Sequence, residues 1–252
     1  MKKIVAIWDI HWMDIWEKIV ERGKDTDKII FVWDYFDSFN LSAPIQIENF
    51  KKILDFQKEN KDKVEILLWN HEYNYLVNWM DNTSWYNSEY SDEINSLLIE
   101  NIKSLKIVIK INNILFSHAW FSQTWINRLN HFNLDLENDF EQEMNELFFS
   151  TYDNNNPVFN FYKYDFSWIW NSINQWPLWV RPESLDNNFF GNYNQVVWHS
   201  YVDKENRLKF KEKWIHFIDN LVTNIWDENN EKKYYLKITE EENKYIFKEE
   251  LI

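Results

Sequence analysis

Five short segments of this sequence place aspartate, asparagine or histidine directly after a run of apolar residues. They read WDIHW at 8–12, WDYFD at 33–37, WNHE at 69–72, SHAW at 117–120 and VWHS at 197–200. Carboxylate, imidazole and amide oxygen together suit a hard or borderline divalent cation such as Mn, Fe or Zn. The five segments therefore predict a divalent metal site.

Each segment by itself has a simpler interpretation. Asp-x-His occurs by chance, and Asn70 in the Asn-His-Glu segment could cap the start of a helix. The prediction of a site depends on the five segments occurring together, each at the end of an expected strand.

The hydrophobic pattern predicts the elements that would carry these segments. Short apolar or β-branched runs predict strands, and apolar residues at helical spacing predict helices. The expected strands are residues 3–7, 29–32, 64–68, 107–111, 114–117, 195–197, 214–218, 234–238 and 245–248; the expected helices are 13–22, 45–60, 123–130 and 136–151. Asn112-Asn113 is typical of a hairpin turn. Alternation of strands and helices predicts a largely parallel sheet with covering helices, whose strand ends collect the ligand-binding residues.

Length and composition narrow the class of protein. We expect a single domain over residues 1–252, with the aromatic-rich and Asn-rich residues 153–194 as a loop-rich cap over the site. The formal net charge of −14 argues against a nucleic-acid partner. The absence of cysteine excludes disulfides, thiolate metal sites and a cysteine nucleophile. No apolar run approaches the roughly 18 residues of a membrane span, and Asp9 and His11 interrupt any signal-peptide core, so we expect a cytoplasmic protein without a membrane partner.

The motif set resembles the calcineurin-like metallophosphoesterases, in particular the phosphoprotein-phosphatase and diadenosine-tetraphosphatase branch. The family motifs run G-D-x-H-G, G-D-x-x-D, G-N-H-E, H-A-G and G-H-(S/T), and the resemblance covers about residues 1–220. TSWYN at 83–87 and PLWVRP at 177–182 look like two further family segments. The resemblance implies an α/β fold of two packed mixed β-sheets flanked by helices, the αββα metallophosphatase sandwich.

The resemblance also implies a site with two divalent metal ions, with Mn expected first and Fe or Zn as alternatives. Asp9, His11 and Asp34 would hold one metal, and Asp34 would bridge to the second, which Asn70, His118 and His199 would complete. Two such cations activate a water for attack on a phosphoester.

The remaining catalytic roles come from the same resemblance. His71 would protonate the leaving group as general acid, Asp37 would orient that imidazole, and Arg181 would clamp the phosphate. The substrate could be a phosphoprotein, a small phosphoester or a dinucleoside polyphosphate. Protein phosphatases of this branch usually continue the second motif as D-R-G, whereas Asp37 is followed here by Ser38, which weakens the phosphoprotein alternative.

Tryptophan stands where the family motifs have glycine. The chain has 16 tryptophans and two glycines, whereas ordinary glycine usage is about 7%. The motif positions concerned are Trp8, Trp12, Trp33, Trp69, Trp120 and Trp198. Glycine there would allow close backbone approach and positive φ, which tryptophan would strain. We therefore interpret these tryptophans as UGA codons that the source reads as glycine. The alternative is a genuine tryptophan-rich binding module or pseudoenzyme without catalysis.

Overall fold

The structure is a computed structural model of the chain. It describes residues 2–8, 15–32, 35–38, 41–77, 86–151, 178, 180, 188–197, 215–217, 234–242 and 244–251. The chain divides into two compact units, which we call the first unit (residues 1–105 and 221–252) and the second unit (residues 106–220). The single domain over residues 1–252 stays a prediction.

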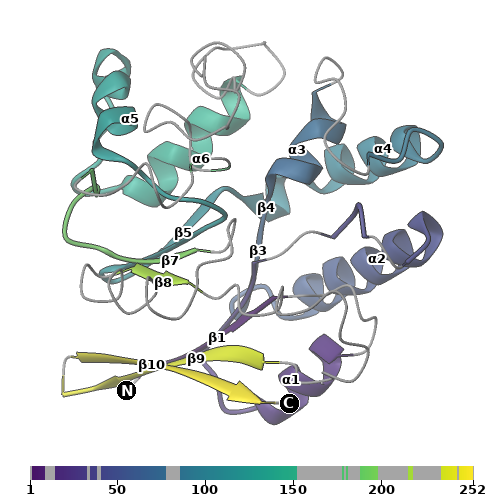
Figure 1. The fold of residues 1–252 in the computed structure, drawn as a ribbon, viewed down its shortest axis with the longest axis horizontal. Helices are drawn as coiled ribbons and strands as arrows, with labels where there is room; N and C mark the ends of the chain where they lie inside the picture. Colours follow the sequence, from purple (N-terminus) through teal and green to yellow (C-terminus); the bar gives the residue numbers. More distant parts are fainter. Residues whose placement is uncertain are drawn as a thin grey trace. The chain divides into compact units, whose positions relative to one another are not determined.

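The first unit is built on a mixed sheet with the strand order β10-β9-β1-β2-β3-β4. Its strands are β1 (Lys3–Ile7), β2 (Lys28–Phe31), β3 (Val64–Leu67), β4 (Leu105–Lys106), β9 (Tyr234–Glu241) and β10 (Lys244–Leu251). β1, β2 and β3 pair in parallel, as the alternating pattern predicts, while β9 runs antiparallel to β1 (Figure 1). The parallel pairing brings the carboxyl ends of β2 and β3 side by side, where two of the predicted motifs begin.

The helices of the first unit are α1 (Ile15–Arg22), α2 (Ala43–Glu59), α3 (Asn70–Leu76), α4 (Ser91–Asn101) and the short 3₁₀ helix η1 (Ile102–Ser104). Aromatic rings pack α1 and α2 on the sheet. Trp16 on α1 lies edge-on to Phe31 of β2, at 5.7 Å between ring centroids, and 5.5 Å from Phe56 of α2. The Trp16 indole also donates a hydrogen bond to Asn49, at 3.0 Å. Packing and hydrogen bonding of this kind stabilise α1 and α2 against the sheet.

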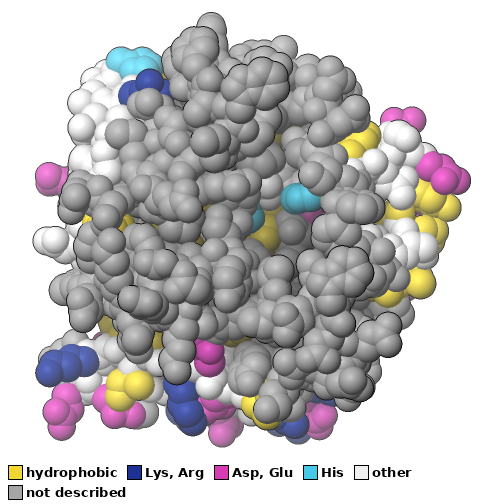
Figure 2. Space-filling view, in the orientation of Figure 1, with side chains coloured by type: hydrophobic (Ala, Val, Ile, Leu, Met, Phe, Trp, Pro, Cys, Tyr) yellow, Lys and Arg dark blue, Asp and Glu magenta, His cyan; other side chains and the backbone are white. Residues whose placement is uncertain are grey.

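The β9–β10 hairpin forms one edge of the first sheet and carries charges of both signs (Figures 1 and 2). Glu250 forms ion pairs with Lys248, at 3.2 Å, and with Lys237, at 3.5 Å. Arg22 of α1 donates a hydrogen bond to the carbonyl oxygen of Leu251 and ties the end of β10 to α1. Charged side chains on an edge strand disfavour pairing with a second chain.

The second unit contains a smaller mixed sheet with the order β5-β6-β7-β8. Its strands are β5 (Val108–Ile111), β6 (Ile114–Ser117), β7 (Asn194–Val197) and β8 (Ile215–Phe217); its helices are α5 (Gln123–Asn127), the 3₁₀ helix η2 (Arg128–Phe132) and α6 (Phe140–Thr151). β5 and β6 form the predicted hairpin, in which Ile111 pairs with Ile114 and Asn112 has φ 54°. Asparagine tolerates this left-handed conformation, which confirms the turn assigned to Asn112-Asn113.

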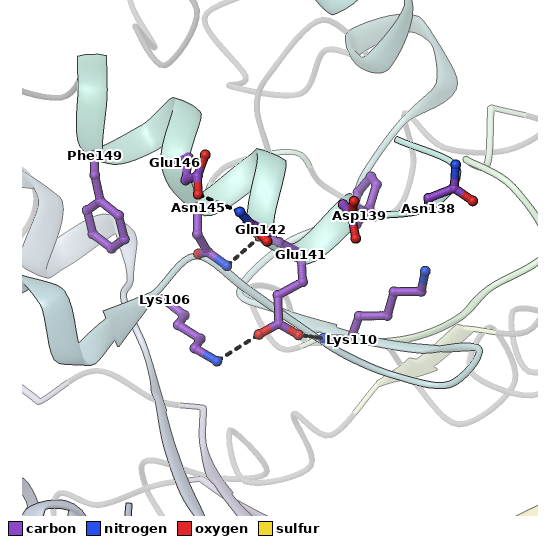
Figure 3. Close-up of a pocket in the computed structure, with 10 residues that line it drawn as sticks. Lys106, Lys110, Asn138, Asp139, Glu141, Gln142, Asn145, Glu146 and Phe149 are labelled. Carbon is purple, nitrogen blue, oxygen red and sulfur yellow. Dashed lines mark hydrogen bonds and ion pairs between the residues drawn. The ribbon is translucent and has the colours of Figure 1, made fainter. Parts of the chain in front are cut away.

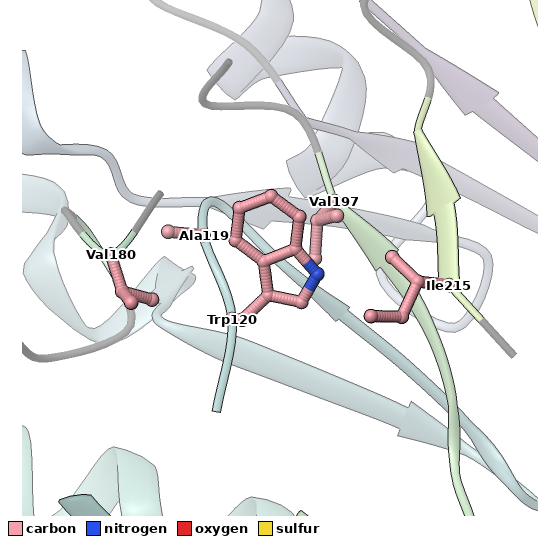
Figure 4. Packing of buried hydrophobic residues seen from close by; sticks show 5 residues of the cluster. All are labelled: Ala119, Trp120, Val180, Val197 and Ile215. Atoms are coloured by element: carbon pink, nitrogen blue, oxygen red, sulfur yellow. The ribbon is translucent and has the colours of Figure 1, made fainter. Parts of the chain in front are cut away.

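The core of the second unit includes one of the motif tryptophans. Trp120 is fully buried in a cluster with Ala119, Val180, Val197 and Ile215 (Figure 4). Its indole lies beside the side chains of Val197 and Ile215, which belong to β7 and β8. The ring therefore packs the end of β6 against the next two strands of the same sheet.

The structure confirms the α/β class with two mixed sheets and flanking helices. It corrects the predicted helix over 136–151, because α6 begins only at Phe140 and residues 136–138 form a turn in which Asn138 donates hydrogen bonds to Asp135. It also extends the predicted helix over 45–60 back to Ala43, where Pro44 occupies the first turn. Most of the predicted cap at 153–194 lies outside the described residues. No helix among the described residues combines the length and apolarity that a membrane crossing requires.

Candidate active site

Helix α3 begins directly after β3 and carries the Asn-His-Glu motif at its start. Trp69 occupies the N-cap position with φ −124° and ψ 173°, and Asn70 is the first helical residue. The alternative in which Asn70 caps the helix is therefore wrong: the cap position belongs to Trp69, and no side chain caps the helix. Asn70 is only 4% exposed, and its Oδ1 atom has no hydrogen-bond partner among the described residues.

A buried amide oxygen without a partner is costly, so its position requires an explanation. Burying a polar group without a hydrogen bond costs about 1–3 kcal/mol on the scale of protein mutations. Binding a divalent cation would satisfy the oxygen, since amide oxygen is a suitable ligand for a hard or borderline metal. Asn70 thus fits the ligand role that the sequence predicts.

His71 and Asp37 form a pair between the start of α3 and the loop after β2. The Nδ1 atom of His71 lies 2.8 Å from Oδ2 of Asp37. The Asp37 side chain is fully buried, while 20% of the His71 side chain is exposed. A carboxylate that accepts from Nδ1–H fixes the tautomer and orientation of the ring and leaves Nε2 as the ring nitrogen that can exchange a proton. The structure therefore brings together the predicted general acid and its orienting carboxylate.

Glu72 holds the loop that carries Asp37. Its Oε1 atom accepts hydrogen bonds from the backbone N–H of Tyr35, at 2.9 Å, and from that of Phe36, at 3.3 Å. Glu72 is fully buried. Asp37 itself has φ 63°, a left-handed conformation that costs energy in a non-glycine residue and persists only where neighbours enforce it. Sequence reasoning assigned no role to Glu72, although it belongs to the recognised motif.

Tyr75 is a further residue of this site that the sequence analysis did not identify. Its hydroxyl donates a hydrogen bond to Oδ1 of Asp37 and accepts one from the backbone N–H of Asn87, at 2.9 Å. The signal available in the sequence was the spacing, because Tyr75 follows His71 by four residues and shares its helix face. Burial, and then the neighbouring Asp37, raise the pKa of the Tyr75 hydroxyl, which keeps it protonated as a donor.

His118 is the predicted ligand that the structure describes in the second unit. It follows the last residue of β6 and is 2% exposed. The Ser117 hydroxyl donates to the carbonyl oxygen of Ala119, at 2.6 Å, and so holds the turn in which His118 lies. The predicted placement of this histidine at a strand end is confirmed.

The other predicted ligands, Asp9, His11, Asp34 and His199, lie outside the described residues, as does Arg181. Within the described ranges, no group of three or more histidine, aspartate or glutamate side chains is arranged to hold a metal ion. The complete ligand set therefore stays a prediction, with Asn70 and His118 as its described members.

The described motif tryptophans are core residues. Trp8 is 1% exposed, and Trp69 and Trp120 are fully buried. None of the three has positive φ. The expectation of left-handed backbone strain at these positions is wrong, because the strand ends leave them in ordinary conformations, as the extended φ of Trp69 illustrates. Their burial also means that these three indoles present no surface on which a ligand could stack.

Two pockets lie among the described residues near charged side chains. The larger, of about 350 Å³, opens at the start of α6, where Glu141 lies between Lys106 and Lys110 (Figure 3). Glu141 accepts from the ammonium of Lys106 and from the backbone N–H of Lys110, both at 2.7 Å. None of the predicted site residues that the structure describes lines this pocket. The smaller, of about 90 Å³, is lined by Asp37 and Tyr75 together with polar side chains of residues 38–46.

Comparison with solved structures finds a similar fold over the whole chain. The structure of a cold-active protein-tyrosine phosphatase from the psychrophile Shewanella sp. matches with a TM-score of 0.57 and 18% identity, covering 100% of this chain and 80% of that one. A metallophosphoesterase from Sphaerobacter thermophilus matches with a TM-score of 0.29 and 13% identity, over 53% of this chain and 57% of that one. No family model and no curated protein matches the chain. At 18% identity, the first likeness shows the fold.

Proposed function

We propose that this chain is a metallophosphoesterase that hydrolyses a phosphoester with the aid of two divalent metal ions. The observation that carries the proposal is the arrangement at the start of α3. A buried amide oxygen without a hydrogen-bond partner among the described residues, on Asn70, directly precedes an imidazole that a buried carboxylate orients. A metal ligand next to an oriented proton donor is the combination that metal-assisted phosphoester hydrolysis uses.

The fold and the composition add support. The fold resembles that of a protein-tyrosine phosphatase, whose substrates are phosphoesters. This chain contains no cysteine, so a cysteine nucleophile is excluded as the means of attacking phosphorus. Histidine, aspartate and asparagine at strand ends supply the alternative, which is attack by an activated water.

The residues have distinct roles in the proposed reaction. Asp9, His11, Asp34, Asn70, His118 and His199 would hold the two metals, with Mn expected first and Fe or Zn as alternatives. When bound, such ions supply Lewis-acid activation of water and of a phosphoryl oxygen. His71 donates a proton from Nε2 to the leaving oxygen, Asp37 holds the ring in the productive tautomer, and Arg181 binds the phosphate.

The substrate class follows from the second motif. Asp37 is followed by Ser38, so the arginine that would help to grip a phosphoprotein is missing at this point. We infer a preference for a small phosphoester or a dinucleoside polyphosphate over a phosphoprotein.

We infer that the tryptophans at positions 8, 12, 33, 69, 120 and 198 are glycines in the working enzyme, encoded by UGA. Their coincidence with every motif glycine supports this inference, as does the count of 16 tryptophans against two glycines. UGA codons at these positions would support it further, and UGG codons throughout would contradict it.

The experiment compares phosphate release from p-nitrophenyl phosphate, a phosphopeptide and diadenosine tetraphosphate, with Mn²⁺ and after metal removal. The chain with glycine at the six positions should hydrolyse the first and third substrates only with metal. Metal-independent hydrolysis would contradict the mechanism. Loss of all activity in a folded, metal-loaded chain would favour a non-catalytic binding module instead.

A further inference from the structure

His71 and Tyr75 lie on one face of α3 and hydrogen-bond to the two oxygens of the Asp37 carboxylate. Tyr75 lies four positions after His71, which places both side chains on the same side of the helix. His71 Nδ1 lies 2.8 Å from Oδ2 of Asp37, and the Tyr75 hydroxyl donates to Oδ1. Neither oxygen of Asp37 can therefore turn without breaking a hydrogen bond to α3.

The Tyr75 hydroxyl is itself held in one orientation. It accepts a hydrogen bond from the backbone N–H of Asn87, which leaves its proton for Asp37. The ring stacks on Tyr86 at 4.6 Å between centroids and meets Phe36 edge-on at 6.0 Å. Tyr75 is 1% exposed, so packing prevents the ring from swinging away from the carboxylate.

The restraint by Tyr75 matters because the Asp37 carboxylate borders open space. Its backbone has φ 63°, and it lines a small polar cavity of about 90 Å³. A carboxylate released from Tyr75 could rotate toward this cavity, which has room for water. The imidazole would then lose the acceptor that fixes its tautomer.

We propose that Tyr75 is a positioning residue that locks the Asp37 carboxylate, and through it the His71 ring, for proton transfer. The inference rests on the proposed function for its catalytic consequence. Tyr75 acts through Asp37 and does not itself contact substrate. Removing its hydroxyl should therefore lower kcat and leave KM unchanged. The effect should be largest where the leaving group needs a proton.

The test is Tyr75→Phe, which removes the hydroxyl and keeps the ring, with Tyr86→Phe as the matched control on the stacked partner. Both variants are made in the chain of residues 1–252. The background is whichever sequence is soluble, either the chain as written or the chain with glycine at the six motif positions. For an alkyl phosphate, Tyr75→Phe should lower kcat by about 10–100-fold, the range typical of residues that orient a catalytic group without touching the substrate. The loss should be smaller for p-nitrophenyl phosphate, and Tyr86→Phe should leave both rates unchanged.

A second measurement separates this inference from the proposed function. The Nδ1–H proton signal of His71 is identified by NMR through its loss in His71→Asn. It should shift or broaden in Tyr75→Phe and stay in place in Tyr86→Phe. An unchanged signal together with an unchanged kcat would overturn the role of Tyr75. If the parent chain hydrolyses no phosphoester, the proposed function fails, and the NMR signal by itself decides whether Tyr75 orients Asp37.

Discussion

The Nδ1 atom of His71 and the Oδ2 atom of Asp37 lie 2.8 Å apart, although 34 positions separate the two residues in the sequence. The contact depends on the parallel pairing of β2 and β3, which brings the loop after one strand beside the helix that follows the other. It gives the site an oriented imidazole.

Replacing His71 with asparagine should lower kcat by about 10²–10⁴-fold, because general acid–base catalysis contributes that much. Metal content should stay at two ions per chain. The loss should shrink for p-nitrophenyl phosphate, whose leaving group needs no proton. Steady-state kinetics with elemental analysis measures both, and His131→Asn, at an exposed histidine of η2, serves as the control. Equal losses for good and poor leaving groups would remove His71 from this role.

Replacing Asp34 with asparagine should weaken both metals together, because one bridging carboxylate would share its charge between them. His199→Ala should weaken mainly one metal. Elemental analysis after dialysis against a series of chelators of increasing metal affinity distinguishes the two patterns. Two tightly bound metals in both variants would show that the ligand assignment is wrong.

Replacing Asn70 with leucine should not lower the free energy of unfolding of the metal-free chain. The Oδ1 atom has no hydrogen-bond partner among the described residues, so its removal sacrifices no hydrogen bond. The rise in Tm on adding Mn²⁺ should shrink, since a ligand is lost. Asn74→Leu is the control at a second buried asparagine of α3, and its metal-induced rise in Tm should match that of the parent. An undiminished rise in Asn70→Leu would argue against Asn70 as a ligand.

Replacing Glu72 with alanine should destabilise the first unit. The backbone N–H groups of Tyr35 and Phe36 would lose their acceptor, and each unsatisfied buried donor costs about 1–3 kcal/mol. Glu72→Gln keeps an oxygen in place of Oε1 and should cost less. Urea denaturation gives the free energy of unfolding of each variant. Equal stability of Glu72→Ala and the parent would show that this carboxylate does not hold the loop.

The chain as written should be unable to bind metal, because bulky rings would stand where the backbone must pass close to the ions, and glycine at positions 8, 12, 33, 69, 120 and 198 together should restore metal binding. Single reversions should do little, because neighbouring sites do not act independently. In the glycine form, Trp16→Gly should cost about 3–5 kcal/mol, the usual loss for removing a buried tryptophan. Trp16 packs against Phe31 and Phe56 and donates to Asn49, so we expect it to be a genuine tryptophan. A soluble, active, two-metal protein made from the literal sequence would contradict the recoding.

Local pattern in the sequence determined the parallel strands, the hairpin at Asn112-Asn113 and the placement of His71 and His118 after strand ends. These features depend on neighbours in the chain: on residue periodicity, turn chemistry and the adjacency of consecutive parallel strands. The resemblance to the metallophosphoesterases predicted the pairing of Asp37 with His71, and the structure confirms their contact.

Tertiary structure decided the features that depend on where side chains turn. Asn70 could have been a helix cap by sequence, but the chain enters α3 with Trp69 at the cap position and leaves the Asn70 oxygen buried. Glu72 turns inward to the backbone of Tyr35 and Phe36, and Tyr75 reaches Asp37 across the fold. No local rule predicts these contacts, because each joins residues distant in sequence through the packing of α3 against the loop after β2. The burial of the Trp69 indole, with its backbone in an extended conformation, likewise depends on tertiary structure. It is set by the space that surrounding elements leave at the end of β3.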